Sequence, residues 1–142
     1  MKLIIAGGRN LSMSCDGILA MIYTTIGAIP CPLEVVCGGA EGIDESGKRF
    51  VELMEEDTII LKPFPAAWTD LSHPDAVIRT RKDGTKYDAI AGHRRNRQMA
   101  EYADALLLIW DGESGGSASM KKEMLKLKKP IYEVTFKCHN LK

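Results

Sequence analysis

The stretch AGHRRNRQMAEYADALLLIWDGESGGS, residues 91–117, contains three kinds of local sequence in a row. It opens as a helix with the basic run RRNR at residues 94–97. An unbroken apolar run at residues 105–110 follows, and it predicts a strand that is buried on both faces. A glycine-rich loop at residues 111–117 then leads into another helix. A helix, a two-sided buried strand and a second helix together indicate a parallel sheet that is covered on both faces.

The rest of the chain repeats this pattern of short apolar runs and amphipathic stretches. Strands are expected at residues 2–6, 33–37, 58–61, 105–110 and 131–135, and helices at residues 14–28, 43–54, 89–103 and 120–128. Ser12 or Ser14 is the expected N-cap of the first helix, and Asp44 of the second. The order predicts an α/β protein with a Rossmann-like three-layer α/β/α fold and a mostly parallel five-stranded sheet.

One long connection, residues 63–90, interrupts this alternation. Asp83-Gly84, with polar residues on both sides, is the expected tip of a hairpin. A connection of this length is usually functional or mobile. Its composition does not resemble a linker, so residues 1–142 are expected to form a single domain.

Composition narrows the class of protein. The formal net charge is zero, which argues against a protein that coats nucleic acid. No apolar run approaches the roughly 20 residues that cross a bilayer, and the N-terminus lacks the long apolar region of a signal peptide. The 4 cysteines have no metal-binding spacing, so reduced thiols in a cytoplasmic protein are expected, without a metal or cofactor.

Three glycine-rich loops, at residues 7–9, 38–42 and 111–117, each follow an expected strand. In doubly wound sheets, ligands bind beyond the carboxyl ends of the strands, where the strand order reverses. That reversal is expected between the first and fourth strands, and all three loops lie at this edge. Glycines and helix N-termini suit a phosphate. A single glycine pair is better explained by a tight turn, whereas three such loops at one edge favour phosphate binding. Neither the P-loop nor the dinucleotide-binding motif is present in full.

Arg9 and Arg95 are the basic residues best placed to hold a phosphate. Arg9 directly follows a glycine pair, and Arg95 stands near a helix start, where the dipole disfavours a cation. A bound anion would offset that cost. Asn96 adds a polar group at the same edge. For Arg94 and Arg97, phosphate binding and a solvated basic face are equally good interpretations.

Carboxylates and aromatic rings complete the set of candidates. Asp111 ends an apolar strand, where it can bind a ribose hydroxyl or act on a bound water. Asp44 is interpreted first as a helix cap and second as a ligand residue, and Glu113 as a solvent-exposed loop carboxylate. Trp68 is able to stack on a base, and His93 is a weak candidate for the pocket.

Four segments in order carry a resemblance to a known family: GGR at 7–9, CGGAEGID at 37–44, AGHRRNRQMAEYADALLLIWDG at 91–112 and SGGS at 114–117. Together they resemble the SLOG superfamily, the Rossmann-like group that includes Smf/DprA and the LOG cytokinin-activating phosphoribohydrolases. The likeness covers most of the chain. It is nearest to the small stand-alone YspA-like members of bacteria and phages.

The resemblance implies a pocket for a nucleotide or nucleotide derivative. The residues that it implies are Gly7, Gly8, Arg9, Gly38, Gly39, Asp44, Arg95, Asn96, Asp111, Gly115, Gly116 and Ser117. The chain departs from the family in two places. The usual S-[KR]-G-T loop has lost its basic residue, and the P-G-G-x-G-T-x-x-E signature of the LOG enzymes is absent. Their hydrolysis of an N-glycosidic bond therefore does not carry over.

Three functions remain open from the sequence. The first is a module that senses or sequesters a nucleotide or an ADP-ribose-like ligand. The second is a hydrolase of an N-glycosidic or phosphoester bond in such a ligand, with Asp111 or Glu113 as general acid or base. The third is an accessory role in DNA processing, against which the zero net charge counts. Rossmann-like domains of this size often pair through helices, so a homodimer is expected.

Overall fold

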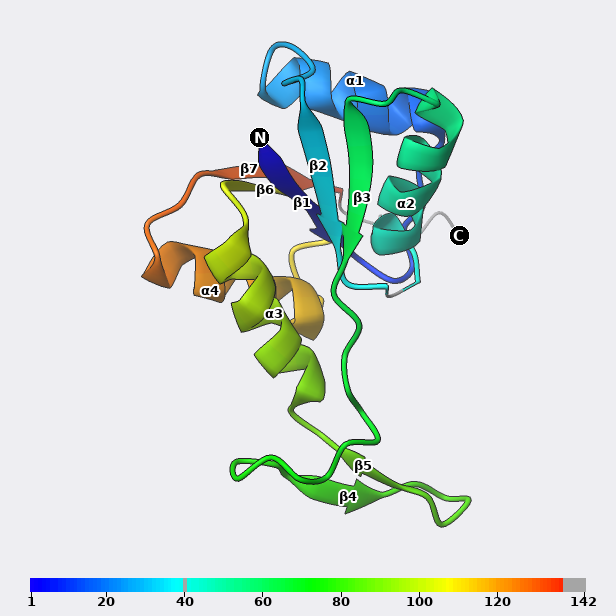
Figure 1. Cartoon of the computed structure of the whole chain (residues 1–142), viewed down its shortest axis with the longest axis vertical. Coiled ribbons are helices and arrows are strands. Elements are labelled where there is room, and N and C mark those ends of the chain that lie inside the picture. Colours follow the sequence, from blue (N-terminus) through cyan, green and yellow to red (C-terminus); the bar gives the residue numbers. More distant parts are fainter. Residues whose placement is uncertain (40, 137–142) are drawn as a thin grey trace.

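A five-stranded parallel sheet forms the centre of the computed structural model, which describes residues 1–39 and 41–136 (Figure 1). The strand order is β3-β2-β1-β6-β7, and each neighbouring pair is parallel. The bounds are β1 (Lys2–Gly7), β2 (Leu33–Cys37), β3 (Ile59–Pro63), β6 (Ala105–Trp110) and β7 (Ile131–Thr135). The order reverses between β1 and β6, as the sequence predicts.

Two helices cover each face of the sheet (Figure 1). On one face lie α1 (Cys15–Thr25) and α2 (Ile43–Met54), and on the other lie α3 (Ala91–Tyr102) and α4 (Gly115–Lys126). Side chains of β1 alternate between the two faces, so Leu3 and Ile5 join one core while Ile4 joins the other. The predicted three-layer Rossmann-like fold is confirmed, and the sheet is parallel throughout.

The helix N-caps match the sequence in one case and differ in the other. Ser14 caps α1, and its side chain accepts a hydrogen bond of 3.1 Å from the backbone N–H of Gly17. The prediction of Asp44 as the N-cap of α2 is wrong, because Gly42 occupies that position with a φ of 80°. A Cβ at Gly42 would lie 2.3 Å from the carbonyl oxygen of Gly8. This close approach of two loops requires a glycine at the cap.

The predicted start of α4 is also wrong. The apolar periodicity begins at Met120, but the helix begins at Gly115, so Gly115, Gly116 and Ser117 form its first turn rather than a loop. Glycine and serine are weak helix formers, which conceals this turn in the sequence. The third strand is likewise displaced and ends at Pro63 instead of stopping before it. An edge strand tolerates proline at its end because no neighbour needs the missing N–H.

The long connection contains an antiparallel hairpin of β4 (Ile78–Thr80) and β5 (Lys86–Asp88). Its predicted tip is confirmed: Gly84 has a φ of 87° and its N–H donates to the carbonyl oxygen of Arg81 at 3.0 Å. The hairpin projects beyond the start of α3, away from the central sheet (Figure 1). It is therefore joined to the rest of the fold mainly at its base.

Candidate functional site

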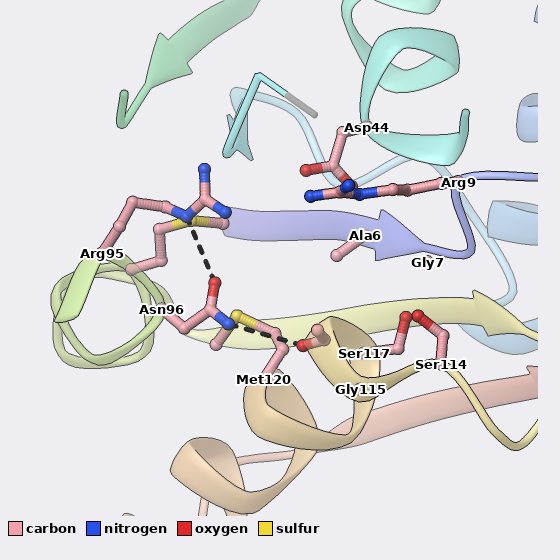
Figure 2. Close-up of a pocket in the computed structure, with 12 residues that line it drawn as sticks. Ala6, Gly7, Arg9, Asp44, Arg95, Asn96, Ser114, Gly115, Ser117 and Met120 are labelled. Atoms are coloured by element: carbon pink, nitrogen blue, oxygen red, sulfur yellow. Dashed lines mark hydrogen bonds between the residues drawn. The ribbon is translucent and has the colours of Figure 1, made fainter. Parts of the chain in front are cut away.

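A cavity of about 300 Å³ lies at the carboxyl end of β1, where the order of the strands reverses. It is bounded by the loop after β1, the first turn of α2, the side of α3 and the start of α4 (Figure 2). Most of the predicted ligand-binding residues line it: Gly7, Arg9, Asp44, Arg95, Asn96, Gly115, Gly116 and Ser117. Its volume is at the lower end of the roughly 300–1,000 Å³ that is typical of small-molecule sites.

The glycine pair after β1 brings three segments together. A Cβ at Gly7 would lie 1.7 Å from the carbonyl oxygen of Ile109, so only glycine permits the close approach of β1 and β6. Gly8 does not line the cavity. Its N–H donates to the carbonyl oxygen of Ile109 at 3.1 Å, and its own carbonyl oxygen accepts from the N–H groups of Leu11 and Ile43. This glycine pair therefore fixes the start of α2 against the end of the sheet.

The start of α4 points into the cavity with backbone donors available. Its N-cap, Ser114, makes no side-chain cap hydrogen bond, and the first bond of the helix runs from the N–H of Ala118 to the carbonyl oxygen of Ser114 at 3.0 Å. The N–H groups of Gly115, Gly116 and Ser117 therefore have no helical acceptor. Gly115 and Gly116 add no side chain that would block them. Such a helix start favours an anion.

The side chain of Ser117, at the start of α4, also lacks a hydrogen-bond partner among the described residues. The residue is 3% exposed, and its Oγ is buried without a hydrogen-bond partner among the described residues. The hydroxyl groups of Ser114 and Ser117 point the same way, toward the end of β1 at Ala6 and Gly7 (Figure 2). A buried hydroxyl without a partner costs free energy, so this atom suits a site that a polar ligand completes.

Two arginines reach the cavity from opposite sides. Arg95 on α3 is half-buried, and its Nη1 donates to the carbonyl oxygen of Gly38 while its Nε donates to Oδ1 of Asn96 at 3.2 Å. Burial lowers the pKa of the Arg95 guanidinium and the nearby charge of Arg9 lowers it further, whereas Asp44 acts in the opposite direction. The charges of Asp44 and Arg9 thus both act on the Arg95 guanidinium, and Asp44 has the larger effect.

Asn96 lines the cavity, but the protein itself uses both ends of its amide. Its Oδ1 accepts from Arg95, and its Nδ2 donates to the carbonyl oxygen of Gly116 at 3.4 Å and to Oγ of Ser119 at 3.2 Å. The residue is 7% exposed. Asn96 therefore fixes α4 and the arginine relative to each other (Figure 2).

Asp44 is the carboxylate among the described residues that line this cavity. It is 6% exposed and stands in the first turn of α2, where the helix dipole favours an anionic side chain. Its carboxylate lies beside the guanidinium group of Arg9 (Figure 2). The cavity thus combines two positive charges with one negative charge.

Gly38 and Gly39 line a neighbouring cavity of about 290 Å³, which shares Arg9 and Arg95 with the first. A Cβ at Gly38 would lie 2.6 Å from Nη1 of Arg95. Gly39 has a φ of 76°, which glycine adopts without strain. The structure therefore assigns the first glycine to close packing and the second to the turn.

Asp111 and Glu113 lie outside these cavities. Oδ1 of Asp111 accepts from the N–H of Glu113 at 2.8 Å and from the N–H of Ser114 at 3.0 Å. These two backbone hydrogen bonds hold the pKa of the Asp111 carboxyl below its ordinary value. Asp111 thus builds the turn that presents the start of α4, and Glu113 is exposed.

The remaining basic candidates have partners elsewhere. Arg94 pairs with Asp88 at 2.7 Å and with Asp75 at 2.9 Å, which ties the base of the hairpin to α3. The side chain of Arg97 is 63% exposed, with its Nε 3.8 Å from a carboxylate oxygen of Glu123. These two arginines do not line the cavity around Arg95.

Sequence reasoning did not assign several lining residues to the site. Met99 and Met120 form part of the cavity wall, although their helical spacing marks them only as core residues.

Trp68, named as a possible stacking residue, lines two cavities beside the arginine pair. His93 lines one of them, and its Nδ1 lies 2.7 Å from Oγ of Ser119.

Two features are absent from residues 1–39 and 41–136. No group of three or more His, Cys, Asp or Glu side chains is arranged to hold a metal ion. No helix in these ranges has the length and apolar character that crossing a membrane demands. Comparison of the chain with models of protein families, with curated proteins and with solved structures found no match.

Proposed function

We propose that this protein binds a nucleotide or a nucleotide-derived, ADP-ribose-like ligand at the carboxyl edge of its sheet. One observation carries the proposal: an uncapped helix start, the buried hydroxyl of Ser117 and the guanidinium groups of Arg9 and Arg95 face one cavity. Each of these groups is more stable beside an anion. Phosphate is the anion that combines this charge with several hydrogen-bond acceptors.

The cavity offers groups for two parts of such a ligand. The backbone N–H groups at residues 115–117 and the two arginines hold phosphate oxygens. Asp44, which lies beside Arg9, accepts hydrogen bonds from ribose hydroxyl groups, the role that the sequence suggested for Asp111. A phosphate and a sugar both find partners there, because the cavity offers donors as well as an acceptor.

Binding is preferred to hydrolysis because the two carboxylates that the sequence offers as general acid or base lie outside the cavity. The candidate general acid or base residues, Asp111 and Glu113, do not line the cavity, and Asp111 is occupied by two backbone N–H groups. A general acid or base must come within hydrogen-bond reach of the proton that it transfers. A sensor or a sequestering protein needs no such group.

Membership of the SLOG superfamily is part of the same proposal. Its support is the set of four sequence segments, all of which contribute residues to the described cavities. A cytoplasmic location is also proposed, since Cys15, Cys31 and Cys37 are free thiols, as reducing compartments maintain them. A homodimer is proposed on the size of the domain, and light scattering should give twice the monomer mass.

Isothermal titration calorimetry with AMP, ADP-ribose and cyclic ADP-ribose isomers tests the binding proposal. Wild-type protein should bind at least one of them with a dissociation constant below about 1 mM, the weak end of specific affinities. Arg95→Ala should weaken binding on the order of tenfold or more, because a charge-assisted hydrogen bond is lost. The matched control Arg97→Ala removes an exposed arginine of the same helix and should change affinity by less than about twofold.

Chromatography of the ligand after long incubation separates binding from turnover. Recovery of unchanged ADP-ribose is expected, and the appearance of a product would replace the binding proposal with the hydrolase. If none of the nucleotides in the panel binds, both the binding proposal and the hydrolase alternative are wrong.

A further inference from the structure

Trp68 lies where two further cavities meet the arginine pair. One, of about 290 Å³, is lined by Pro63, Pro65 and Ala66 in addition to Trp68, and the other has a volume of about 330 Å³. Both also include Arg9 and Arg95, which line the cavity at the start of α4. The three cavities therefore lie side by side around the same two arginines.

The indole ring rests directly on the backbone of α3. A Cβ at Gly92 would lie 3.0 Å from Cη2 of Trp68 and 3.4 Å from its Cζ2. Any larger residue at position 92 would therefore displace the ring. Trp68 remains half-buried, so part of its surface stays available to a ligand after this packing.

A buried carboxylate fixes the segment that carries the tryptophan. The N–H of Asp88 donates to the carbonyl oxygen of Trp68 at 2.7 Å. Oδ1 of the same aspartate accepts from the N–H groups of Val77 and Ile90, each at 3.1 Å, and its Oδ2 accepts from Nη1 of Arg94 at 2.7 Å. The loop before the hairpin and the start of α3 are thereby tied together, so the ring is presented by a fixed frame.

We infer that Trp68 stacks on the base of the ligand, in the cavity that it shares with Pro63, Pro65 and Ala66. The inference rests on the proposed function and narrows its ligand class to nucleotides that retain a planar base. Pro63 and Pro65 add apolar surface to the same cavity. No carboxylate lines either tryptophan cavity among the described residues, so Arg9 and Arg95 supply the charge at its phosphate end.

The test compares two ligands that differ in the base. AMP and ribose 5-phosphate are titrated calorimetrically into wild-type protein, Trp68→Ala, Trp68→Phe and Arg95→Ala. Trp68→Ala should weaken AMP binding on the order of tenfold or more, as loss of base–aromatic stacking does elsewhere. It should change ribose 5-phosphate binding by less than about twofold, whereas Arg95→Ala should weaken both ligands, because it removes a phosphate contact. Trp68→Phe should retain most of the AMP affinity, since a ring is still present.

Distinct outcomes contradict the two proposals. The stacking inference is wrong, and the proposed function stands, in two cases in which AMP binds wild-type protein. In the first, Trp68→Ala leaves the AMP affinity unchanged. In the second, Trp68→Ala and Trp68→Phe each weaken AMP and ribose 5-phosphate equally. If wild-type protein binds neither these probes nor ADP-ribose and its cyclic isomers, the proposed function fails and the inference fails with it. The melting temperature of each variant establishes that a lost affinity is not a lost fold.

Discussion

The guanidinium group of Arg95 occupies the space that a side chain at Gly38 would fill, and it donates a hydrogen bond to the carbonyl oxygen of that glycine. A Cβ at position 38 would lie 2.6 Å from Nη1 and 2.7 Å from Cζ. Gly38 follows β2, and Arg95 lies on α3, 57 residues later in the chain. The position of the cation in the cavity therefore depends on the absence of a side chain at a distant strand end.

Gly38→Ala should separate binding from stability. Gly38 is not in the left-handed region, so the backbone tolerates alanine, and the displaced group is the end of a flexible side chain. We expect the free energy of unfolding to change by less than about 1 kcal/mol. Nucleotide affinity should fall on the order of tenfold, because the guanidinium group moves away from the phosphate position. Calorimetric titration and thermal unfolding measure the two effects.

The matched control is Gly17→Ala on α1, which lies outside the described cavities around Arg95. A Cβ there would meet side-chain atoms of Met13 and Ser14 at 3.4 Å, a contact that small shifts accommodate. Alanine in a helix should raise stability by about 0.5–1 kcal/mol and leave affinity unchanged. Equal affinity of Gly38→Ala and wild-type protein would show that Arg95 does not contact the ligand from this position.

Gly7→Ala should instead damage the fold. A Cβ there would lie 1.7 Å from a backbone oxygen of β6, which has no flexible end to move aside. The two central strands would have to separate at their carboxyl ends, at a cost of about 3 kcal/mol or more. Its neighbour offers the control, since a Cβ at Gly8 would meet only the side chain of Leu11, at 3.4 Å. Chemical denaturation measures the stability of both variants. Similar losses in the two would contradict the assignment of Gly7 to the close approach of β1 and β6.

These glycines also show which parts of the site can be predicted from the sequence alone. Gly7-Gly8, Gly38-Gly39 and Gly115-Gly116 look alike as pairs after strands, and their common place at one edge of the sheet follows from the apolar runs that precede them. For the first two pairs the separate tasks depend on atoms far away in the chain, a carbonyl of β6 and a guanidinium of α3. The third pair opens α4, where weak helix formers conceal the first turn. No local pattern contains that information.

The same limit explains the roles of the charged residues. Arg94 and Arg95 are adjacent, and the sequence offers little to distinguish them. Successive helical residues point about 100° apart, so one arginine faces the hairpin and the other faces the cavity. For Asp111 the sequence suggests a ligand role, because the carboxylate stands at a strand end. In the structure its Oδ1 instead accepts hydrogen bonds from two backbone N–H groups of the following turn.

Asp88 should make stability depend on acid pH. The hydrogen bond from Arg94 and the backbone N–H groups of Ile90 and Val77 hold the pKa of its carboxyl below the ordinary value. A lowered folded-state pKa stabilises the protein above the unfolded value near 3.9, and this contribution is lost as pH falls through the folded-state pKa. Asp88→Asn should therefore lower the melting temperature at pH 7 and flatten its decline below about pH 4.

The control for this aspartate is Asp83→Asn at the hairpin tip. Among the described residues, the carboxylate of Asp83 accepts hydrogen bonds within its own turn, from the N–H and hydroxyl of Thr85. Its replacement should lower the melting temperature less than Asp88→Asn does. The proposed frame for Trp68 is contradicted if both variants melt together with wild-type protein at pH 7.

Ser117→Ala should raise stability while lowering affinity. The Oγ of Ser117 is buried without a partner among the described residues, so its removal relieves the cost of an unsatisfied hydroxyl, about 1–3 kcal/mol. Alanine is also the better helix former in this first turn of α4. The unliganded variant should therefore melt a few degrees higher, since about 1 kcal/mol corresponds to roughly 2–4 °C in a protein of this size.

In the presence of a saturating nucleotide the stability advantage of the variant over wild-type protein should shrink by about 1 kcal/mol. If the hydroxyl donates to a phosphate oxygen, its loss weakens binding by about 1 kcal/mol, or roughly fivefold. Ligand that binds only the folded state raises the melting temperature in proportion to the logarithm of its affinity, so wild-type protein should gain more than the variant. Matched thermal scans with and without AMP measure both quantities on one sample. A variant that is stabilised yet binds AMP as tightly as wild-type protein would place the phosphate away from Ser117.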